Sequence, residues 1–484
     1  MDYSLEYVFK VLADIGYTPQ GRNCLAYSPE EDLCHSLFAD LLKELEIRPC
    51  VDAFGNTYGT YFPPDVASDT PAVAIGSHLD SVEGGGRYDG VLGVAAGVVL
   101  AHRIIEATKQ GKCKPNAPMR IIAWRAEESD RFRNSCIGSK GASGKLEDKD
   151  LALRSRVEPM ILLNEAISQR SGKDPSPVAN KAVKCLLELH IEQGPQLQEH
   201  QSGQQDNKPF VGIVTPGIAG SLRFTIKLPP MKLHAVARMI VEATNIATDL
   251  DDIQQPFRAT FTPPGKAFNV GRDCTEIFCS DKEQIANIVQ IAKEMESKVD
   301  CCGKKITLRG PHTFHSGTHP MSFRLGVDMV LDAARLILKI PDSYCLSWPE
   351  FSCSGGWVLQ LDVRAGDEEL LEQGRLALEE TLSKIHPTFL PVSSAVGKTK
   401  PVLLTKGIMD LFERKAKESG IYSVLMACGA GHDVQVPDVK ERGLLLVPSN
   451  NGGVSHHHTE KTFMEDAQAG LQVLEGSVLE LLQQ

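Results

Sequence analysis

Four apolar stretches of this sequence each end in residues that could bind a metal ion or move a proton. They deliver, in chain order, His78 with Asp80 and Asp89, Glu127 with Glu128, His190 with Gln193, and His456. Neutral imidazole and carboxylate groups are the usual nitrogen and oxygen ligands of zinc-like metals. Each fragment alone also has a bland interpretation, since a lone histidine at a strand end is more often a structural residue. Four such strand ends in one chain predict a metal centre.

The first fragment reads IGSHLDSVEGGGRYDGVLGV and separates His78 from Asp89 by a glycine-rich loop. Such a loop allows both side chains to reach one cation. Asp80 follows the histidine by two positions and could accept a hydrogen bond from the ring nitrogen that does not face the metal. We therefore expect Asp80 to fix the orientation of the His78 ring.

The second fragment, AWRAEESDRF, places Glu127 and Glu128 at the end of an apolar strand. Adjacent side chains of a strand point in opposite directions, so one carboxylate can bind a metal while the other faces the substrate. That division suits a metal-activated water and its general base. An isolated pair of glutamates would otherwise be interpreted as a solvated acidic turn.

Composition restricts the partners of this chain. It has 484 residues, 42% of them hydrophobic, and a formal net charge of -11 without a long basic run. We therefore expect more than one domain and a small-molecule substrate, and we expect no binding to nucleic acid or to a membrane. The N-terminus lacks a targeting pattern, no apolar run resembles a membrane span, and thirteen irregularly spaced cysteines indicate reduced thiols, so a cytoplasmic location is expected.

The metal-binding fragments belong to an alternation of strands and helices. PAVAIGSH and APMRIIAWRAEE are typical of short buried strands, and the helical pattern VLGVAAGVVLAHRIIEATKQG lies between them. This order predicts an α/β fold with a mostly parallel sheet and helices on both faces. Sites in such sheets form at the carboxyl ends of the strands, where His78 and Glu127 stand.

The middle of the chain contains a predicted internal repeat. Two units, at about 220–300 and 304–386, each follow the order β-α-β-β-α. After Pro387 the first pattern returns. The sequence therefore predicts a catalytic domain made of residues 1–219 and 388–484, with an α+β lid domain at 220–387 inserted into it.

Seven segments in order now support a resemblance over nearly the whole chain. They are GSHLDSVEGGGRYDGVLGVAAG, AEESDRF, LELHIEQGPQLQE, GIVTPGIAGSLRF, FHSGTHPMSFR, GAGHDV and VPSNNGGVSHHHTE. The chain resembles the hydantoinase/carbamoylase amidohydrolases of the aminoacylase and carboxypeptidase superfamily, a group of two-metal hydrolases that includes N-carbamoyl-L-amino-acid hydrolase, β-ureidopropionase and allantoate amidohydrolase.

The resemblance implies roles for the site residues. His78, Asp89 and His190 match the ligands of one metal, and Asp89, Glu128 and His456 match those of the other, with Asp89 bridging. Glu127 matches the general base, Asp80 the partner of His78, and Gln193 a contact to the ureido or amide end of the substrate. His432 and Asp433 match a motif near the site whose role is open.

This assignment predicts hydrolysis of a C–N bond in an N-carbamoyl amino acid or a related ureido or linear amide compound. Two divalent ions sharing a water lower its pKa, Glu127 takes the proton, and the resulting hydroxide attacks the carbonyl carbon. Imidazole and carboxylate ligands accommodate Zn or Mn, and also Co or Ni. Two alternatives remain open: a dipeptidase or N-acyl-amino-acid hydrolase with the same site, and a non-catalytic binding protein that retains the fold.

The lid departs from the pattern of the family. The resemblance implies substrate contacts for Asn269 in the first unit and for His315 and Arg364 in the second unit. We expect the doubled lid to imitate, in one eight-stranded sheet, the paired lids of two subunits. The protein would then be a monomer with a pseudo-dimeric lid, and the alternative is a homodimer.

Overall fold

The chain divides into two compact units in the computed structural model. One unit comprises 1–218, 403–426 and 431–484, and the other comprises 219–402 and 427–430. The structure describes all residues except 1–2, 195, 204–207, 229–231, 250–256, 263–273, 280–281, 295–297, 303–304, 310–333, 336, 340–345, 348–351, 354–355 and 386–394.

The first unit is built on a mixed sheet with a parallel centre. Its strand order is β18 (Val402–Leu403), β8 (Phe210–Ile218), β20 (Glu441–Val447), β7 (Val183–Ile191), β5 (Ala72–His78), β6 (Met119–Trp124), β4 (Thr57–Tyr61) and β3 (Pro49–Val51), and β19 (Tyr422–Cys428) pairs with β8. The neighbours β20, β7, β5 and β6 are parallel, whereas β4 and β3 on one side and β8 on the other pair antiparallel. The prediction of an α/β fold with a mostly parallel central sheet is confirmed.

The register of the parallel strands brings their carboxyl ends to one edge of the sheet. His78 at the end of β5 is paired with Trp124 at the end of β6, and Leu446 of β20 is paired with His190 of β7. All seven residues of β5 are buried, as expected for a strand covered on both faces. The loops that follow β5, β6, β7 and β20 therefore leave the sheet side by side.

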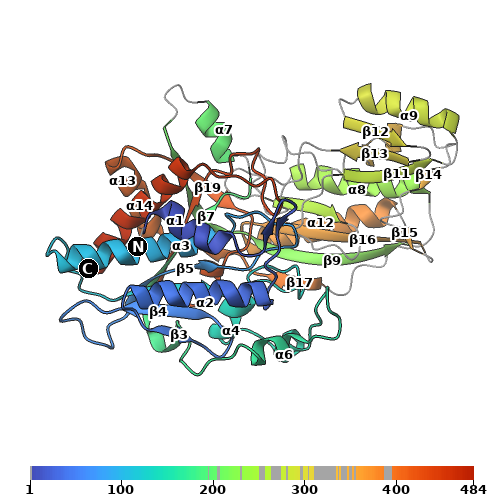
Figure 1. Ribbon diagram of the computed structural model, residues 1–484. Helices are drawn as coiled ribbons and strands as arrows, with labels where there is room; N and C mark the ends of the chain where they lie inside the picture. The colour runs from blue at the N-terminus through green and yellow to red at the C-terminus, as the bar shows by residue number, and fades with distance from the viewer. Residues whose placement is uncertain are drawn as a thin grey trace. The chain divides into compact units, whose positions relative to one another are not determined.

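The longest helices of this unit pack on or beside the sheet. They are α1 (Leu5–Ala13), α2 (Pro29–Glu44), α3 (Val91–Lys109), α13 (Lys406–Glu418) and α14 (Met464–Gln483), and shorter ones are α4 (Ile137–Ala142), α5 (Asp148–Leu151), α6 (Leu163–Ser168) and α7 (Gln196–Ser202). Helix α3 lies against β5, β6 and β7 and beside α1 (Figure 1). A Cβ atom on Gly93 would lie 2.4 Å from the Leu189 carbonyl oxygen, so glycine allows this close approach.

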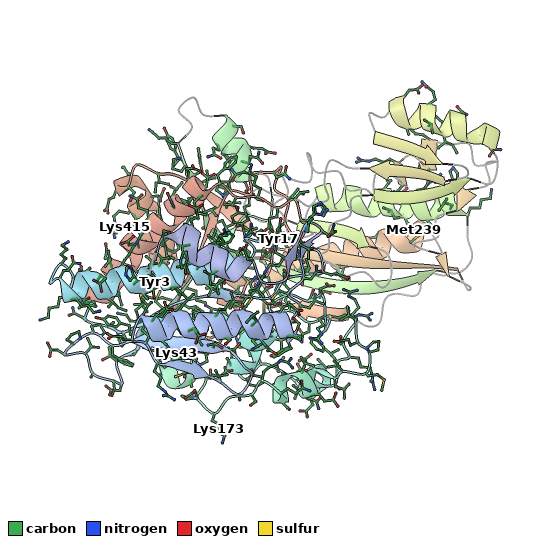
Figure 2. The ribbon with its side chains drawn as sticks, viewed as in Figure 1. Tyr3, Tyr17, Lys43, Lys173, Met239 and Lys415 are labelled. Atoms are coloured by element: carbon green, nitrogen blue, oxygen red, sulfur yellow. The ribbon has the colours of Figure 1, made fainter. Side chains whose placement is uncertain are left out.

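Helix α3 is, by length and composition, apolar enough to cross a membrane, but 72% of its most apolar window is buried inside the protein. That burial is typical of the core helix of a globular domain. Its remaining surface includes His102, on which Tyr3 stacks with ring centroids 4.4 Å apart; Tyr3 is labelled in Figure 2.

The second unit contains two sheets among the residues that the structure describes. The first has the order β10 (Phe257–Thr262), β16 (Gly356–Ala365), β9 (Gly220–Leu228) and β17 (Ala395–Thr399), with β15 (Ser352–Cys353) paired to β16. The second has the order β12 (Lys298–Cys302), β13 (Lys305–Arg309), β11 (Cys274–Cys279) and β14 (Leu346–Ser347). Helices α8 (Leu233–Asp249) and α12 (Glu368–Ile385) pack on the first sheet, and α9 (Lys282–Glu294) packs on the second.

This arrangement differs from the single eight-stranded lid sheet that the repeat predicts. Strands β9, β10 and β11 belong to one predicted unit, yet β9 and β10 flank β16 of the other unit, and β11 lies in the second sheet. Strands that are distant in the chain pair with one another, so the two sheets do not follow the predicted repeat units. The duplication of the lid stays a prediction from sequence.

Candidate metal centre

Two groups of buried candidate ligands that share Asp89 meet at the carboxyl edge of the central sheet. The first group is His78, Asp89 and His190, whose ligand atoms all lie within 4.8 Å of one another. His190 Nε2 is 3.0 Å and His78 Nε2 is 3.3 Å from Asp89 Oδ1. These three residues come from the end of β5, from the glycine loop after it and from the end of β7.

The second group consists of Asp89, Glu128 and His456. His456 Nε2 is 2.8 Å from Glu128 Oε1 and 3.1 Å from Asp89 Oδ2. Asp89 therefore directs one carboxylate oxygen to each group. Five side chains that the sequence predicted as ligands come together, and one carboxylate is common to both groups.

Glycine makes the approach of Asp89 to His78 possible. Gly90 has φ +70°, and a Cβ atom there would lie 2.5 Å from the His78 ring. A side chain at this position would both strain the backbone and displace the imidazole. Glu460 holds the same loop, because its Oε1 accepts hydrogen bonds from the backbone N–H groups of Tyr88 and Asp89 at 2.8 and 3.2 Å.

Asp80 connects the first group to the pair of glutamates. One of its carboxylate oxygens lies 3.3 Å from His78 Nδ1. Its two oxygens also accept hydrogen bonds from the backbone N–H groups of Glu127 and Glu128, both at 3.0 Å. The fully buried Asp80 thus orients the His78 ring and fixes the backbone that carries both glutamates.

Glu127 and Glu128 lie in a loop beyond the end of β6 rather than within the strand. Ala126 between them and the strand has φ 54°, an unusual conformation for a residue with a side chain. The Glu128 carboxylate faces His456, whereas the Glu127 carboxylate accepts a hydrogen bond from the Cys136 thiol at 3.2 Å. The two carboxylates therefore have separate partners.

Burial and neighbouring charges shift the ionisation of these groups. Burial lowers the pKa of His78, but the nearby carboxylates of Asp80 and Asp89 outweigh it and hold that pKa well above its usual value. Burial alone would raise the pKa of Asp89, yet the charge of His190 lowers it well below the usual range. For Glu127, burial raises the pKa well above that of an exposed glutamate, and the charge of Glu128 adds to this rise.

The donor set fits two divalent cations. Asp89 Oδ1 accepts no hydrogen bond from any residue that the structure describes, although two imidazole nitrogens lie close to it. Several electron-pair donors that crowd together are expected where a cation completes the site. The ligands are histidine nitrogens and carboxylate oxygens without a thiolate, which suits zinc, manganese, cobalt or nickel.

Gln193 lies within the same cluster. Its Nε2 donates a hydrogen bond to Asp89 Oδ2 at 2.9 Å and lies 3.2 Å from His456 Nε2, and its Oε1 is buried without a partner among the described residues. The side chain is therefore placed beside both ligand groups, with one polar atom still able to accept a hydrogen bond.

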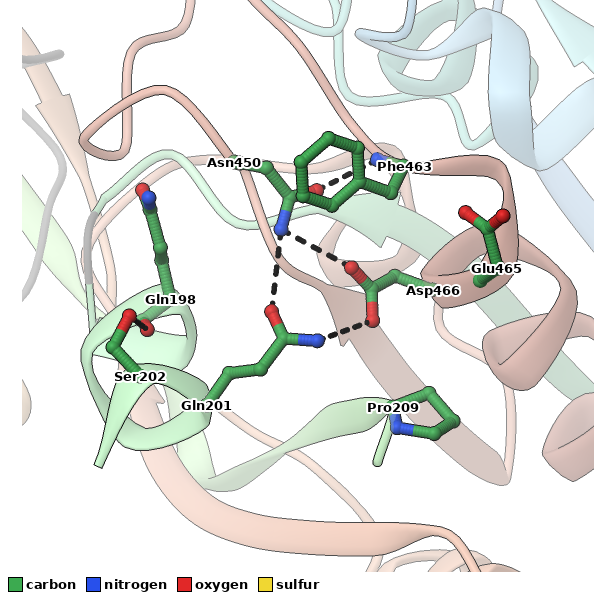
Figure 3. Close-up of a pocket in the computed structure, with 8 residues that line it drawn as sticks. All are labelled: Gln198, Gln201, Ser202, Pro209, Asn450, Phe463, Glu465 and Asp466. Carbon is green, nitrogen blue, oxygen red and sulfur yellow. Dashed lines mark hydrogen bonds between the residues drawn. The ribbon is translucent and has the colours of Figure 1, made fainter. Parts of the chain in front are cut away.

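Hydrogen bonds to α7 and α14 hold the loop that carries His456. Asn450 Nδ2 donates hydrogen bonds to Asp466 Oδ2 at 3.1 Å and to Gln201 Oε1 at 3.3 Å, and Gln201 Nε2 donates to Asp466 Oδ1 at 3.0 Å (Figure 3). These contacts join α7, the histidine loop and the first turn of α14. They stabilise the loop conformation in which His456 adopts φ 59°.

Several residues of the site were not found by sequence reasoning. The Ser455 hydroxyl donates to Asp89 Oδ2 at 2.9 Å, and Ser77 and the Val434 N–H donate to the buried Glu188 carboxylate, each at 2.9 Å. The only sequence signal was position, because Ser455 and Glu460 flank the three consecutive histidines and Glu188 precedes His190 by two residues.

His432 and Asp433, whose role the sequence left open, lie next to the first ligand group. The His432 ring packs edge-on against the His190 ring with centroids 4.5 Å apart. Burial lowers the pKa of His432 well below its usual value, which favours the neutral ring. Asp433 Oδ1 accepts a hydrogen bond from Ser139 at 2.5 Å.

Three residues of the lid segment are predicted to contact the substrate, and the structure describes only Arg364 among them. Arg364 is on β16, buried, and donates a hydrogen bond to the Gly429 carbonyl at 2.5 Å. Asn269 and His315 lie outside the described residues, so their predicted contacts stay predictions from sequence.

Comparisons with known proteins show the family of this chain. A family model described as Peptidase family M20/M25/M40 matches residues 74–480. An N-carbamoyl-L-amino acid amidohydrolase of Geobacillus stearothermophilus is 30% identical, over 98% of this chain and 96% of the relative. A probable allantoate deiminase of Oryza sativa is 23% identical, over 95% of this chain and 84% of the relative.

A solved structure described as an amidase of the hydantoinase/carbamoylase family from Burkholderia multivorans has the same fold. Its TM-score is 0.67 with 19% sequence identity, and the match covers 99% of this chain and 97% of the other.

Proposed function

This chain belongs to Peptidase family M20/M25/M40, and we propose that it is a metal-dependent hydrolase of the C–N bond in an N-carbamoyl amino acid or a related ureido compound. One observation carries the proposal. Two groups of three buried ligands share Asp89, and a carboxylate that belongs to neither group, Glu127, directly precedes a ligand of the second group. This is the arrangement that a two-metal hydrolase with a general base requires.

The two cations would be held by His78, Asp89 and His190 on one side and by Asp89, Glu128 and His456 on the other. Two divalent ions held by these residues would supply a positive charge that polarises the scissile carbonyl group and lowers the pKa of a nearby water. Glu127 takes the proton of the attacking water through its carboxylate and later gives it to the leaving nitrogen. A carbamoyl substrate would yield the amino acid, ammonia and carbon dioxide.

The surrounding residues position these groups. Asp80 keeps His78 Nε2 turned towards Asp89 by holding the opposite ring nitrogen, and it fixes the backbone of both glutamates. The Cys136 thiol orients the Glu127 carboxylate. Gln193 offers an amide beside both ligand groups, and we assign it a contact to the ureido or amide end of the substrate.

The substrate class rests on the relatives. The Geobacillus relative is called an N-carbamoyl-L-amino acid amidohydrolase and the rice relative a probable allantoate deiminase, and both names describe hydrolysis of a carbon–nitrogen bond. We assign Asn269, His315 and Arg364 to the substrate through the family resemblance. A cytoplasmic location completes the proposal, and the free thiols of Cys24, Cys34, Cys50, Cys113, Cys136, Cys185 and Cys428 are consistent with a reducing compartment.

An ammonia-release screen tests the proposed function. The protein, reconstituted separately with zinc and manganese, is incubated with carbamoyl-α-amino acids, carbamoyl-β-alanine, allantoate and simple dipeptides. We expect ammonia from one carbamoyl or ureido compound, and a loss of turnover of about a thousandfold in Glu127→Gln at unchanged metal content, as for removal of a general base. Cleavage of a dipeptide alone, or full activity of Glu127→Gln, would contradict the proposal.

A further inference from the structure

Two buried cysteines face one another beside Leu79, the residue that follows His78. Cys24 Sγ and Cys34 Sγ are 3.8 Å apart, and neither residue is exposed to solvent. Cys34 lies on α2, and Cys24 lies in the segment that precedes this helix. A disulfide needs a sulfur–sulfur distance of about 2.0 Å, so a small side-chain movement would bring the two sulfurs to bonding distance.

A buried guanidinium lies beside this pair. Arg22 is 0% exposed, and its Nη2 donates a hydrogen bond to Cys34 Sγ at 3.3 Å and to the Leu79 carbonyl at 2.8 Å. Its Nε donates to the Ile15 carbonyl at 3.2 Å. No carboxylate within the described part of the chain forms an ion pair with Arg22, so a thiolate at Cys34 is the anion best placed to neutralise it.

The pKa values of the two thiols are shifted in opposite directions. The hydrogen bond with Cys24 lowers the pKa of Cys34, and the positive charge of Arg22 lowers it further, against the effect of burial. Burial raises the pKa of Cys24 well above its usual value. Because Arg22 donates its hydrogen bond to Cys34 Sγ, Cys34 is the thiol placed to act as nucleophile, and Cys24 is the thiol placed to resolve the reaction.

We propose that Cys24 and Cys34 form an oxidation site at which a peroxide converts the dithiol to an intrachain disulfide. The Cys34 thiolate attacks one peroxide oxygen, the O–O bond breaks, and the departing hydroxide is protonated to water. The Cys24 sulfur then attacks the sulfenic sulfur of Cys34, the S–S bond forms and the S–O bond breaks. The Cys24 proton leaves with that hydroxide as a second water, so two thiols are oxidised and one peroxide is reduced.

The pair also contacts the chain segment that follows the metal ligand His78. The Cys24 thiol donates to the Leu79 carbonyl at 3.3 Å, and the Cys24 N–H donates to the Ser81 hydroxyl at 3.0 Å. Oxidation removes the thiol proton and leaves Arg22 without a thiolate beside it. We therefore expect the disulfide to loosen the segment that contains Asp80 and to weaken metal binding. This second part rests on the proposed function.

Peptide mass spectrometry of the peroxide-treated protein tests the oxidation site directly. Trypsin releases one peptide, Asn23 to Lys43, that contains both cysteines. After alkylation of the unfolded protein, we expect this peptide to be lighter by two hydrogens and unalkylated, and to return to the dithiol form with dithiothreitol. Cys185 is an internal control, because it is equally buried and burial raises its pKa. It should remain a thiol.

If both cysteines of this peptide could still be alkylated until Cys185 was also oxidised, the proposed oxidation site would be wrong. Sulfinic acid at Cys34 without a disulfide would overturn it as well. In Cys24→Ser, Cys34 should accumulate as a sulfenic acid that dimedone traps. Titration with zinc, without substrate, should give an affinity about tenfold lower for the disulfide form than for the dithiol form. Equal affinities would remove the link to the metal centre, whatever the substrate screen shows.

Discussion

Asp89 is the residue on which the proposed chemistry depends, because it supplies an oxygen to each candidate ligand group. The five candidate ligands, Glu127 and Asp80 could all be named from the sequence, because each lies at the end of an apolar stretch or in the loop that follows it, and the family resemblance implied their roles. Ser455, Glu188 and Glu460 could not, because their contacts depend on how the loops fold back on one another. The contact between the Cys136 thiol and Glu127 could not be predicted either, because it depends on two residues with positive φ, Ala126 and Cys136 itself.

The Cys136 contact leads to a prediction at the residue scale. Cys136→Ala removes the hydrogen bond that orients the Glu127 carboxylate, so kcat should fall about tenfold with little change in KM. Cys136→Ser retains a donor at the same position and should recover most of the activity. Steady-state kinetics on metal-reconstituted protein provide the measurement. Equal kcat for Cys136→Ala and the unchanged protein would show that the thiol only fills space.

At the scale of elements, the order of strands and helices along the chain was enough to predict the parallel centre of the sheet. The antiparallel flanks were not predicted, because β3, β4 and β8 pair through tertiary contacts that leave no periodic pattern. The second unit shows the same limitation more strongly. Its β10 and β16 are adjacent in one sheet although nearly a hundred residues separate them in the chain.

The turn before β4 gives a pH-dependent prediction for the stability of this element. Asp52 accepts hydrogen bonds from the backbone N–H groups of Phe54 and Asn56, and burial raises its pKa to about 6. Because the folded pKa lies above the unfolded value, this contribution to stability is fully present below pH ~4 and is lost as the pH rises towards the folded pKa.

Asp52→Asn should remove that dependence. The difference in free energy of unfolding between the variant and the unchanged protein should shift by about 2 kcal/mol between pH 4 and 7, in the direction that favours the variant at the higher pH. Urea unfolding followed at several pH values measures it. A difference that stays constant over this range would mean that Asp52 is ionised at pH ~4 in the folded protein.

At the scale of the whole molecule, the doubled lid predicted from the sequence implies that one chain suffices for activity. We propose a monomer whose doubled lid replaces the paired lids of two subunits. Sedimentation of the metal-loaded protein should then give a mass near the 52.8 kDa of one chain. Activity confined to a species of twice that mass would favour the homodimer.

The central claim is that two cations share Asp89, and diffraction tests it most directly. Crystals grown with zinc or manganese should show two anomalous peaks about 3.5–4 Å apart. One peak should contact His78 and His190, the other Glu128 and His456, and both should contact Asp89. A single peak, or two peaks of which Asp89 contacts only one, would contradict the account.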